Sequence, residues 1–404
     1  MLRRTVDEYK TIEVELSADE ARLLSEVAGP RLQVALGSGE GLWTLTATSY
    51  VGTLVTPFIE LLVRPKASLH NVFQMLDVAP DAFGPQDFGF ESDRNLLAIV
   101  ADLFARSVER TIGTGLLRSY RHTEERLMAL RGRIDMTAAI RRPGIPIPVP
   151  CRFDEYTADI LENRALKGSL RRLLQVPGVR PHTRRSLALA LARFEEVSDA
   201  PVDPAAIGRV VYTRLNRHYR QPLALASLIL RNLTVIDRFG SSDASGFMVN
   251  MNDLFQNWVT DRLRRHLRGR LAVVNEPTVR LGTCGQVSMQ PDLVFYAADE
   301  ECYVADVKYK LTATGVGRSP DYYQLLAYTT AMDLPEGLLI YCQADGDAPD
   351  REVVARHTTK RLRTHAIDLS GTPDEVEDAV EHLADLVWKQ SRITYPDASM
   401  VGAL

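Results

Sequence analysis

Two apolar runs joined by a short turn constrain the fold of this chain most. Residues 287–297 and 302–309 are rich in Val, Tyr, Phe and Ala, and Ala298–Glu300 between them is typical of a turn. A helix at Asn252–Leu267 and a strand at 271–281 precede this hairpin, and a helix, a strand and a helix follow it. The pattern predicts a mixed α/β unit in this part of the chain.

Antiparallel pairing across this turn brings two acidic side chains together. If the turn centres on residue 299, Asp292 lies opposite Asp306, and directly opposed side chains have Cβ atoms about 4.5–5.5 Å apart. Lys308 follows two residues after Asp306 and therefore projects from the same face. Two carboxylates this close repel each other unless a cation lies between them, and Mg²⁺ suits such oxygen ligands.

These residue types predict a site that hydrolyses phosphodiesters. A Mg²⁺ ion held by Asp292 and Asp306 lowers the pKa of a bound water and stabilises the negative charge of the transition state. The ammonium group of Lys308 can orient that water or neutralise charge on the phosphate. The alternative is an exposed cross-strand salt bridge, which contributes at most about 1 kcal/mol to stability. A second acid-x-Lys triplet, Glu8–Lys10, has no such hairpin before it.

A helix after the hairpin supports this site. Ser319-Pro-Asp321 provides an N-cap, a Pro at the first helical position and an acid in the first turn. Gln324 and Tyr328 then lie one turn apart on one face, where they can bind a DNA phosphate or orient a base. The alternative for both residues is ordinary packing of an amphipathic helix.

The chain divides into three parts, which predicts an α+β multidomain fold. Residues 1–94 are β-rich and end in a linker, residues 95–245 are mostly helical, and residues 246–404 form the mixed α/β unit. In the first part, Ser17–Glu20 is a capping box that opens a short helix, and Gly37–Gly41 is a hairpin turn. Strands are expected at 11–16 and 42–64, the linker at 79–94, helices at 95–121, 161–174, 182–196 and 222–237, and an extended proline-rich segment at 141–150.

The net charge of −4 hides an uneven distribution. The balance of Lys and Arg over Asp and Glu is −6 in residues 1–94, +9 in residues 118–193 and −5 in residues 343–404. A basic middle between acidic ends is typical of a phosphate-binding surface whose flanks face protein. The alternative is that the arginines solvate helix faces.

Several protein classes are excluded. No run of 18 apolar residues occurs, so no membrane span is expected. The four cysteines lie far apart, which argues against a zinc ribbon or an Fe–S cluster and fits reduced thiols in a cytoplasm. The sequence contains no P-loop, and its histidines form no zinc-hydrolase motif. Any nucleotide-driven motor is therefore expected on another chain.

On these motifs the chain resembles the McrC family, the nuclease subunit of GTP-dependent, modification-directed restriction systems, over nearly its whole length. Residues 246–404 resemble the PD-(D/E)xK nuclease fold through Pro291-Asp292 and Asp306–Lys310. The resemblance implies catalytic roles for Asp292, Asp306 and Lys308. Metal binding is expected at Asp292, Asp306 and Val307, and DNA-binding or supporting roles are expected for Gln324, Tyr328 and Lys310. The blocks that carry the resemblance outside the nuclease motif are Leu62–Lys66, Asn71–Leu76, Leu130–Asp135 and Cys151–Asn163.

One position departs from the family pattern. McrC-like proteins often read Leu-Phe-Glu on the helix before the hairpin, whereas this chain reads Leu254-Phe255-Gln256. A neutral amide is a poorer Mg²⁺ ligand than a carboxylate. Either Asp253 substitutes for the missing acid, or the metal site is weaker.

The resemblance implies a Mg²⁺-dependent DNA endonuclease subunit of a type IV, 5-methylcytosine-type restriction complex in the cytoplasm, active only in that complex. Its expected partners are double-stranded DNA and a hexamer of an McrB-like AAA+ GTPase, whose GTP hydrolysis it stimulates. We expect the acidic residues 1–94 to dock this ring and the basic middle to hold DNA. Two alternatives stay open. One is a non-catalytic adaptor that activates an AAA+ NTPase, with a site weakened by Gln256, and the other is a RecB-like exonuclease.

Overall fold

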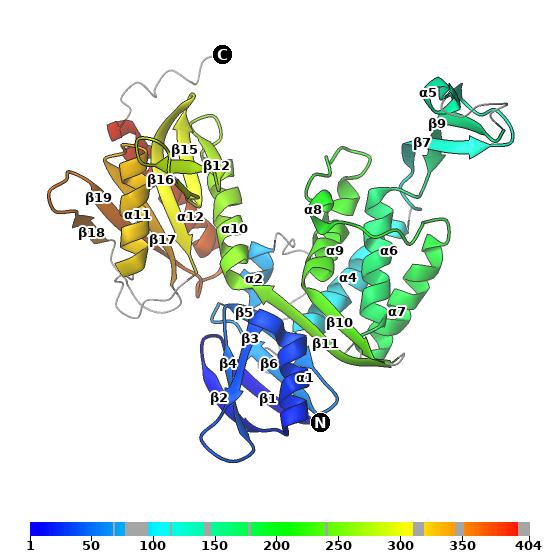
Figure 1. Ribbon diagram of the computed structural model, residues 1–404, viewed down its shortest axis with the longest axis horizontal. Coiled ribbons are helices and arrows are strands. Elements are labelled where there is room, and N and C mark those ends of the chain that lie inside the picture. The colour runs from blue at the N-terminus through cyan, green and yellow to red at the C-terminus, as the bar shows by residue number, and fades with distance from the viewer. Residues whose placement is uncertain are drawn as a thin grey trace.

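The computed structural model shows a β-rich N-terminal part, a helical middle with a projecting arm, and a C-terminal α/β part (Figure 1). It describes residues 1–67, 69–76, 96–113, 115–140, 147–176, 179–238, 241–309, 319–343 and 351–394. Within these ranges, no helix combines the length and the apolar character that crossing a bilayer requires. The expected linker at 79–94 lies outside the described residues.

The N-terminal part contains small sheets that share a core with helix α1 (Ala18–Ala28). The capping box is confirmed, since Glu20 N donates to Ser17 Oγ (3.3 Å) and Ser17 N donates to Glu20 Oε2 (2.8 Å). The hairpin turn at residues 37–41 is also confirmed, because it joins two antiparallel strands. The other elements here are β1 (Leu2–Asp7), β2 (Thr11–Glu15), η1 (Gly29–Arg31), β3 (Leu32–Leu36), β4 (Leu42–Ala47), β5 (Tyr50–Val55), β6 (Ile59–Arg64) and α2 (Leu69–Met75).

Two strands from much later in the chain complete the first sheet. β10 (Leu233–Arg238) and β11 (Ser241–Asn250) extend its order to β1-β6-β5-β11-β10, and β11 is antiparallel to β5. The expected boundary between residues 245 and 246 needs correction, because it falls inside β11. The helix expected at 222–237 ends at Asn232, since the next residues include Thr, Val and Ile, which favour strands.

The middle part is a cluster of helices around a continuous apolar core. The helix expected at 161–174 is confirmed, and the one expected at 95–121 ends at Ile112, next to Gly113. Asn163 is fully buried and ties this core together, because its Nδ2 donates to the carbonyls of Leu117 and Ala158. The helices are α4 (Leu96–Ile112), α6 (Leu161–Leu174), α7 (Pro181–Leu191), η3 (Ala192–Phe194), α8 (Pro204–Ile207), η4 (Arg217–Tyr219) and α9 (Arg220–Asn232).

The expectation of a mostly helical middle holds for these helices, but a β arm that was not expected projects from them (Figure 1). Its sheet has the order β7-β9-β8, with β7 (Ser119–Leu127), β8 (Arg133–Ile134) and β9 (Val149–Thr157), and α5 (Met136–Ile140) lies near its tip. Pro148 and Pro150 keep the start of β9 out of a helix, while residues 141–146 lie outside the described residues. The arm exposes several large apolar side chains, namely Tyr120, Met128, Leu130, Met136, Ile140, Ile147 and Tyr156.

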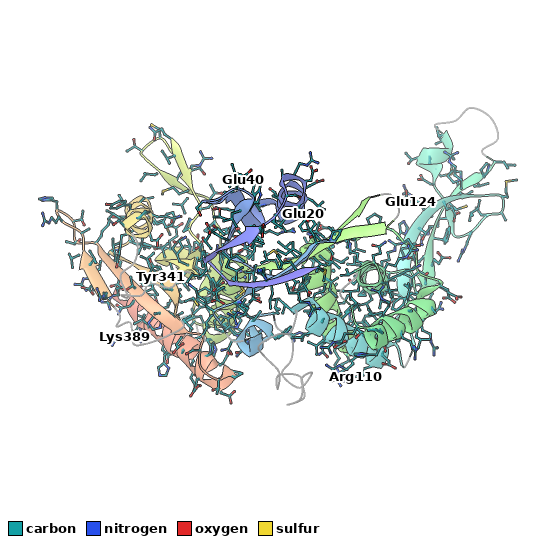
Figure 2. The ribbon with its side chains drawn as sticks, turned by 90° about the horizontal axis from the view of Figure 1, so that it is seen from below. Glu20, Glu40, Arg110, Glu124, Tyr341 and Lys389 are labelled. Carbon is teal, nitrogen blue, oxygen red and sulfur yellow. The ribbon has the colours of Figure 1, made fainter. Side chains whose placement is uncertain are left out.

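The C-terminal part is a six-stranded sheet with helices on both faces. Its order is β12-β15-β16-β17-β19-β18, with β16, β17 and β19 parallel. One face packs against α10 and α12 and the other against α11. The elements are α10 (Met251–His266), β12 (Ala272–Asn275), β13 (Val279–Leu281), β14 (Val287–Met289), β15 (Leu293–Ala297), β16 (Glu300–Lys308), α11 (Ser319–Ala331), β17 (Glu336–Gln343), β18 (Arg351–Val354), β19 (Arg361–Asp368) and α12 (Pro373–Thr394). In Figure 2, Tyr341 of β17 and Glu124 of the arm lie at opposite ends of the molecule.

Side chains from the N-terminal part reach into the C-terminal part at two places. Asn71 of α2 donates from Nδ2 to the carbonyls of Leu369 (2.7 Å) and Gly371 (2.9 Å). Glu8, which follows β1, is fully buried and accepts a hydrogen bond from the hydroxyl of Tyr309 (3.1 Å). Because Tyr309 directly follows β16, the N-terminal part contacts the strand that carries Asp306 and Lys308.

Candidate active site

The hairpin of β15 and β16 places Asp292 opposite Asp306, as the sequence predicts. The paired residues nearest the site are Leu293 and Ala305, and continuing this register by one residue reaches the two acids. The turn itself differs from the prediction, because it has two residues, Ala298 and Asp299. An irregularity between Phe295 and Tyr296 shifts the register by one and restores the predicted pairing at the site.

Asp306 is completely buried, with 0% of its surface exposed. It lies within β16, between β15 and β17, on the face that α11 covers. Burial and the neighbouring carboxylate of Asp292 raise the pKa of Asp306 to about 7. Its Oδ1 has no hydrogen-bond partner among the described residues. Burying an ionised carboxylate costs free energy unless a cation neutralises its charge.

Lys308 and Asp292 complete the predicted set. Lys308 Nζ lies 2.6 Å from Asp306 Oδ2 and 3.7 Å from Asp292 Oδ2, and its side chain is only 19% exposed. Although burial lowers the pKa of Lys308, the carboxylates of Asp306 and Asp292 raise it above its usual value. The alternative of an exposed salt bridge is therefore wrong, because the three groups are largely removed from water.

Main-chain contacts hold Asp292 in place. Its Oδ2 accepts a hydrogen bond from the N–H of Val307 (2.8 Å). The carbonyl of Gln290, two residues earlier, accepts one from the hydroxyl of Tyr328 (3.1 Å). Gln324 Nε2 in turn donates to that hydroxyl (2.6 Å). Tyr328 is buried and Gln324 is exposed, so Tyr328 packs beside the site while the amide of Gln324 reaches solvent.

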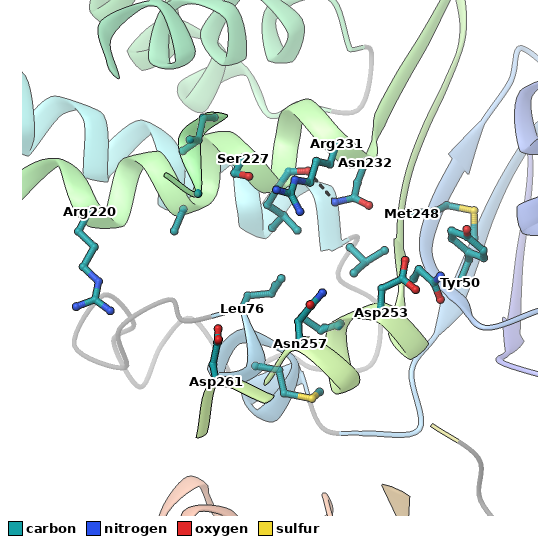
Figure 3. Close-up of a pocket in the computed structure, with 18 of the residues that line it drawn as sticks. Tyr50, Leu76, Arg220, Ser227, Arg231, Asn232, Met248, Asp253, Asn257 and Asp261 are labelled. Atoms are coloured by element: carbon teal, nitrogen blue, oxygen red, sulfur yellow. Dashed lines mark hydrogen bonds between the residues drawn. The ribbon is translucent and has the colours of Figure 1, made fainter. Parts of the chain in front are cut away.

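The helix α10 also reaches the site, through Gln256 and not through Asp253. Gln256 Nε2 donates to Asp292 Oδ1 (3.3 Å) and to Oε1 of Glu276 (3.2 Å). Asp253 instead lines a cavity of about 590 Å³ between α10 and α9, where Figure 3 shows it near Asn257. Of the two alternatives for this position, substitution by Asp253 does not fit the structure, because the side chain of Asp253 faces this cavity. Asp292 does not line the cavity.

Glu276 was not predicted from the sequence. The strand expected at 271–281 is broken here, because Glu276 has a left-handed φ of 50° and precedes Pro277. Its N–H donates to the carbonyl of Asp292 (3.1 Å). Glu276 can be located only once the pairing of β12 with β15 is known. Asn275 lies opposite Leu293 in that pairing, so Glu276 is the next residue and lies beside Asp292. Lys310, a further predicted residue, lies outside the described residues.

The residues present fit a Mg²⁺ ion. In the described part of the chain, no three His, Cys, Asp or Glu side chains form a ready-made metal cluster. However, Mg²⁺ commonly binds through one or two carboxylates while waters and substrate phosphates supply the rest. Asp292 and Asp306 supply two, and the buried Oδ1 of Asp306 is an acceptor that a cation would satisfy.

The fold and the site define a multidomain α/β protein with a sheltered acid–lysine site on a hairpin. The model of a family described as "McrBC 5-methylcytosine restriction system component" matches residues 45–342. The chain therefore belongs to the McrBC family of restriction system components, which confirms the resemblance drawn from its sequence. None of the curated proteins compared with the chain matches it.

One solved structure shows a similar fold over nearly the whole chain. One chain of a refined half-complex from a tetradecameric assembly of Thermococcus gammatolerans McrB AAA+ hexamers with bound McrC has a TM-score of 0.58 and 20% identity to this chain. The match covers 96% of this chain and 100% of that chain. A chain of the cryo-EM structure of the Thermococcus gammatolerans McrBC complex has 22% identity over 66% of this chain and 88% of that chain. Its TM-score is 0.40.

Proposed function

We propose that this chain is the Mg²⁺-dependent DNA endonuclease subunit of a GTP-dependent, 5-methylcytosine-directed restriction complex, with a PD-(D/E)xK nuclease domain at its C-terminal end. The observation that carries the proposal is the fully buried Asp306 beside Asp292 and Lys308, in a chain of the McrBC family. Such an arrangement of two carboxylates and a lysine suits phosphodiester hydrolysis.

Each residue of the site has a distinct part in this chemistry. Asp292 and Asp306 would hold the ion, with Val307 beside them contributing main-chain groups. Bound Mg²⁺ supplies a water of lowered pKa and charge stabilisation for the phosphate. Lys308 remains protonated beside the two acids and presents a positive charge to the phosphate. Tyr328 supports the chain before Asp292, and Gln324 extends that support towards DNA.

The proposed partner is a hexamer of an McrB-like AAA+ GTPase. The support is the likeness to a chain from an assembly of McrB AAA+ hexamers with bound McrC. We assign docking of this ring to the acidic residues 1–94, and DNA binding to the basic residues 118–193. Double-stranded DNA held by this middle part would extend to the hairpin of the C-terminal part.

The test of catalysis is Asp306→Asn, which removes a metal ligand and keeps the volume of the side chain. In the complex reconstituted with the partner GTPase, GTP, Mg²⁺ and methylated DNA, we expect cleavage to fall by about 100-fold or more. Asp299→Asn in the exposed turn is the matched control and should cleave normally. Cleavage by Asp306→Asn at the wild-type rate would show that this site is not catalytic.

A non-catalytic adaptor is the second candidate, because Gln256 places an amide where a carboxylate is common in the family. The same reconstitution separates the two. An adaptor stimulates the partner's GTP hydrolysis while neither the wild-type chain nor Asp306→Asn supports cleavage. A RecB-like exonuclease would instead release nucleotides from DNA ends without the partner.

A further inference from the structure

Three acidic residues lie in a row across three neighbouring strands at one end of the C-terminal sheet. Asp306 belongs to β16, Asp292 precedes β15, and Glu276 follows β12. The registers of β12 with β15 and of β15 with β16 both continue by one residue onto these positions. Glu276 is therefore the neighbour of Asp292 on the side away from Asp306.

A neutral amide bridges Glu276 and Asp292, the middle member of this row. Gln256 Nε2 donates to Glu276 Oε1 (3.2 Å) and to Asp292 Oδ1 (3.3 Å). Both carboxylate oxygens therefore point at the same nitrogen. A position between two carboxylates favours a positively charged group. Among the described residues, no Lys, Arg or His forms an ion pair with Glu276.

The main chain holds Glu276 in this position. A left-handed φ of 50° is unfavourable for a residue with a side chain and persists only where the surroundings enforce it. Arg264 of α10 donates to Val273 O (3.1 Å) and to Asn275 Oδ1 (2.5 Å), which fixes the residues just before Glu276. Gln256 and Arg264 lie two helical turns apart, so one side of α10 positions both the amide and the acid.

The adjacent Asp306 shows that this end of the sheet is built for a cation. Its side chain is fully buried, and its Oδ1 has no hydrogen-bond partner in the described part of the chain. Asp292 contacts both the buried acid and the amide, because its Oδ2 faces Lys308 and Val307 while its Oδ1 faces Gln256. The three carboxylates form no ready-made metal cluster among the described residues, so the side chain of Glu276 has to turn towards an ion held by Asp292 and Asp306.

We infer that Glu276 supplies to the metal centre the carboxylate that position 256 lacks. The inference rests on the proposed function, since it assigns a further ligand to the same site. Rotation of the Gln256 amide would present its oxygen, instead of its NH₂ group, to the ion. The acid that family members often carry on the helix is thus replaced by one at the end of the neighbouring strand, and the charge of the site is kept.

The test measures metal binding directly in the full-length chain, without DNA or partner. Mn²⁺ affinity is determined from the paramagnetic resonance signal of the free ion, and Mg²⁺ affinity by competition. Glu276→Gln should weaken binding by about 10- to 100-fold. Glu300→Gln, at an exposed position on the same hairpin, is the matched control and should bind as the wild type does. Because Glu276 is exposed, its variant should keep the wild-type unfolding temperature.

A second variant tests the replacement itself. Adding Gln256→Glu to Glu276→Gln should restore most of the lost affinity, since a carboxylate returns to the same neighbourhood of Asp292. If Gln256→Glu does not restore the metal affinity that Glu276→Gln loses, Glu276 does not replace the acid at position 256. Unchanged affinity in Glu276→Gln, with weakened affinity in Asp306→Asn, would remove Glu276 from the site and leave the proposed function intact. Unchanged affinity in both would contradict the metal site as a whole.

Discussion

The carboxyl of Glu8 makes the stability of the protein depend on pH. Burial raises its pKa from 4.5 to about 7, although hydrogen bonds from the Lys66 main chain and the Tyr309 hydroxyl lower it. The ammonium of Lys66, the carboxylate of Asp7 and the thiol of Cys342 also face this group. Because the folded chain binds this proton more tightly than the unfolded chain, the contribution of Glu8 to stability is fully present below pH 4.5 and is lost as the pH rises through about 7.

Glu8→Gln should remove this dependence. The amide resembles the protonated acid, so the variant should be more stable than the wild type at pH 8, by up to about 3 kcal/mol, and similar to it at pH 5. Urea unfolding of the full-length chain at the two pH values measures the difference. A wild-type chain that gains stability between pH 5 and pH 8 relative to the variant would contradict the raised pKa.

Among the individual residues of the candidate site, some were predicted from the sequence and others were not. The positions of Asp292, Asp306 and Lys308 follow from alternation and antiparallel pairing around one short turn. Glu276 does not follow from the same reasoning, because β13 and β14 separate it from Asp292 along the chain. Contacts between residues on either side of the β13–β14 hairpin depend on which strands pair with each other. The periodicity of the sequence does not specify strand partners.

At the scale of elements, the pairing of β5 with β11 depends on Gly52. Its φ of 137° is open to glycine alone, and a Cβ here would lie 2.0 Å from the carbonyl oxygen of Phe247. Gly52→Ala should destabilise the protein by about 3 kcal/mol or more, because strain and a main-chain clash combine. Gly41→Ala, which also has a positive φ but faces open space, should cost only about 1 kcal/mol. Equal unfolding free energies for the two variants would argue against close pairing of these strands.

Local sequence signals predicted single helices and strands better than they predicted which strands pair in a sheet. The capping box of α1, the helix at 161–174 and the second strand of the hairpin are confirmed, because each depends on neighbouring residues. The strand expected at 287–297 divides into β14 and β15, which belong to different sheets. The arm was missed because the helical pattern of α4 was extended to residue 121, past Gly113 and into the first residues of β7. The return of β10 and β11 to the first sheet is a long-range pairing, which short sequence windows do not contain.

For the whole molecule, this return makes the N-terminal part inseparable from the rest. Deleting residues 1–90 removes β1, β5 and β6, and it exposes the apolar side chains of β11 that pack against them. The remaining piece should aggregate or unfold without cooperativity, as size-exclusion chromatography and thermal unfolding would show. A monodisperse, cooperatively folding piece would contradict the shared sheet.

Docking by residues 1–94 is therefore better tested on the intact chain. Glu13 and Glu15 are exposed on β2, away from the C-terminal part, and Glu13→Lys with Glu15→Lys reverses their charge without removing core. If this surface docks the ring, stimulation of the partner's GTP hydrolysis should fall while the unfolding temperature is kept. If the double variant stimulates GTP hydrolysis as well as the wild type does, the surface around β2 does not dock the ring.

The isolated chain should cleave DNA slowly or not at all. It contains no P-loop, and the nearest side chain on α10 is an amide. Cleavage is measured with purified chain and Mg²⁺, before and after addition of the partner and GTP. Rapid cutting by the chain alone would contradict dependence on the partner and favour the exonuclease.

The path of the chain through its first sheet also defines a module. The chain leaves this sheet after β6, forms the middle helices and the arm, and returns to the same sheet at β10. Residues 96–232 thus lie between β6 and α2 on one side and β10 on the other, as an insertion in the chain that forms the first sheet. Such an insert can be lengthened, shortened or exchanged while the scaffold and the hairpin keep their geometry. If the middle part holds DNA as proposed, a chimera that carries the middle of another family member should acquire the DNA preference of its donor and retain the cleavage chemistry of its host.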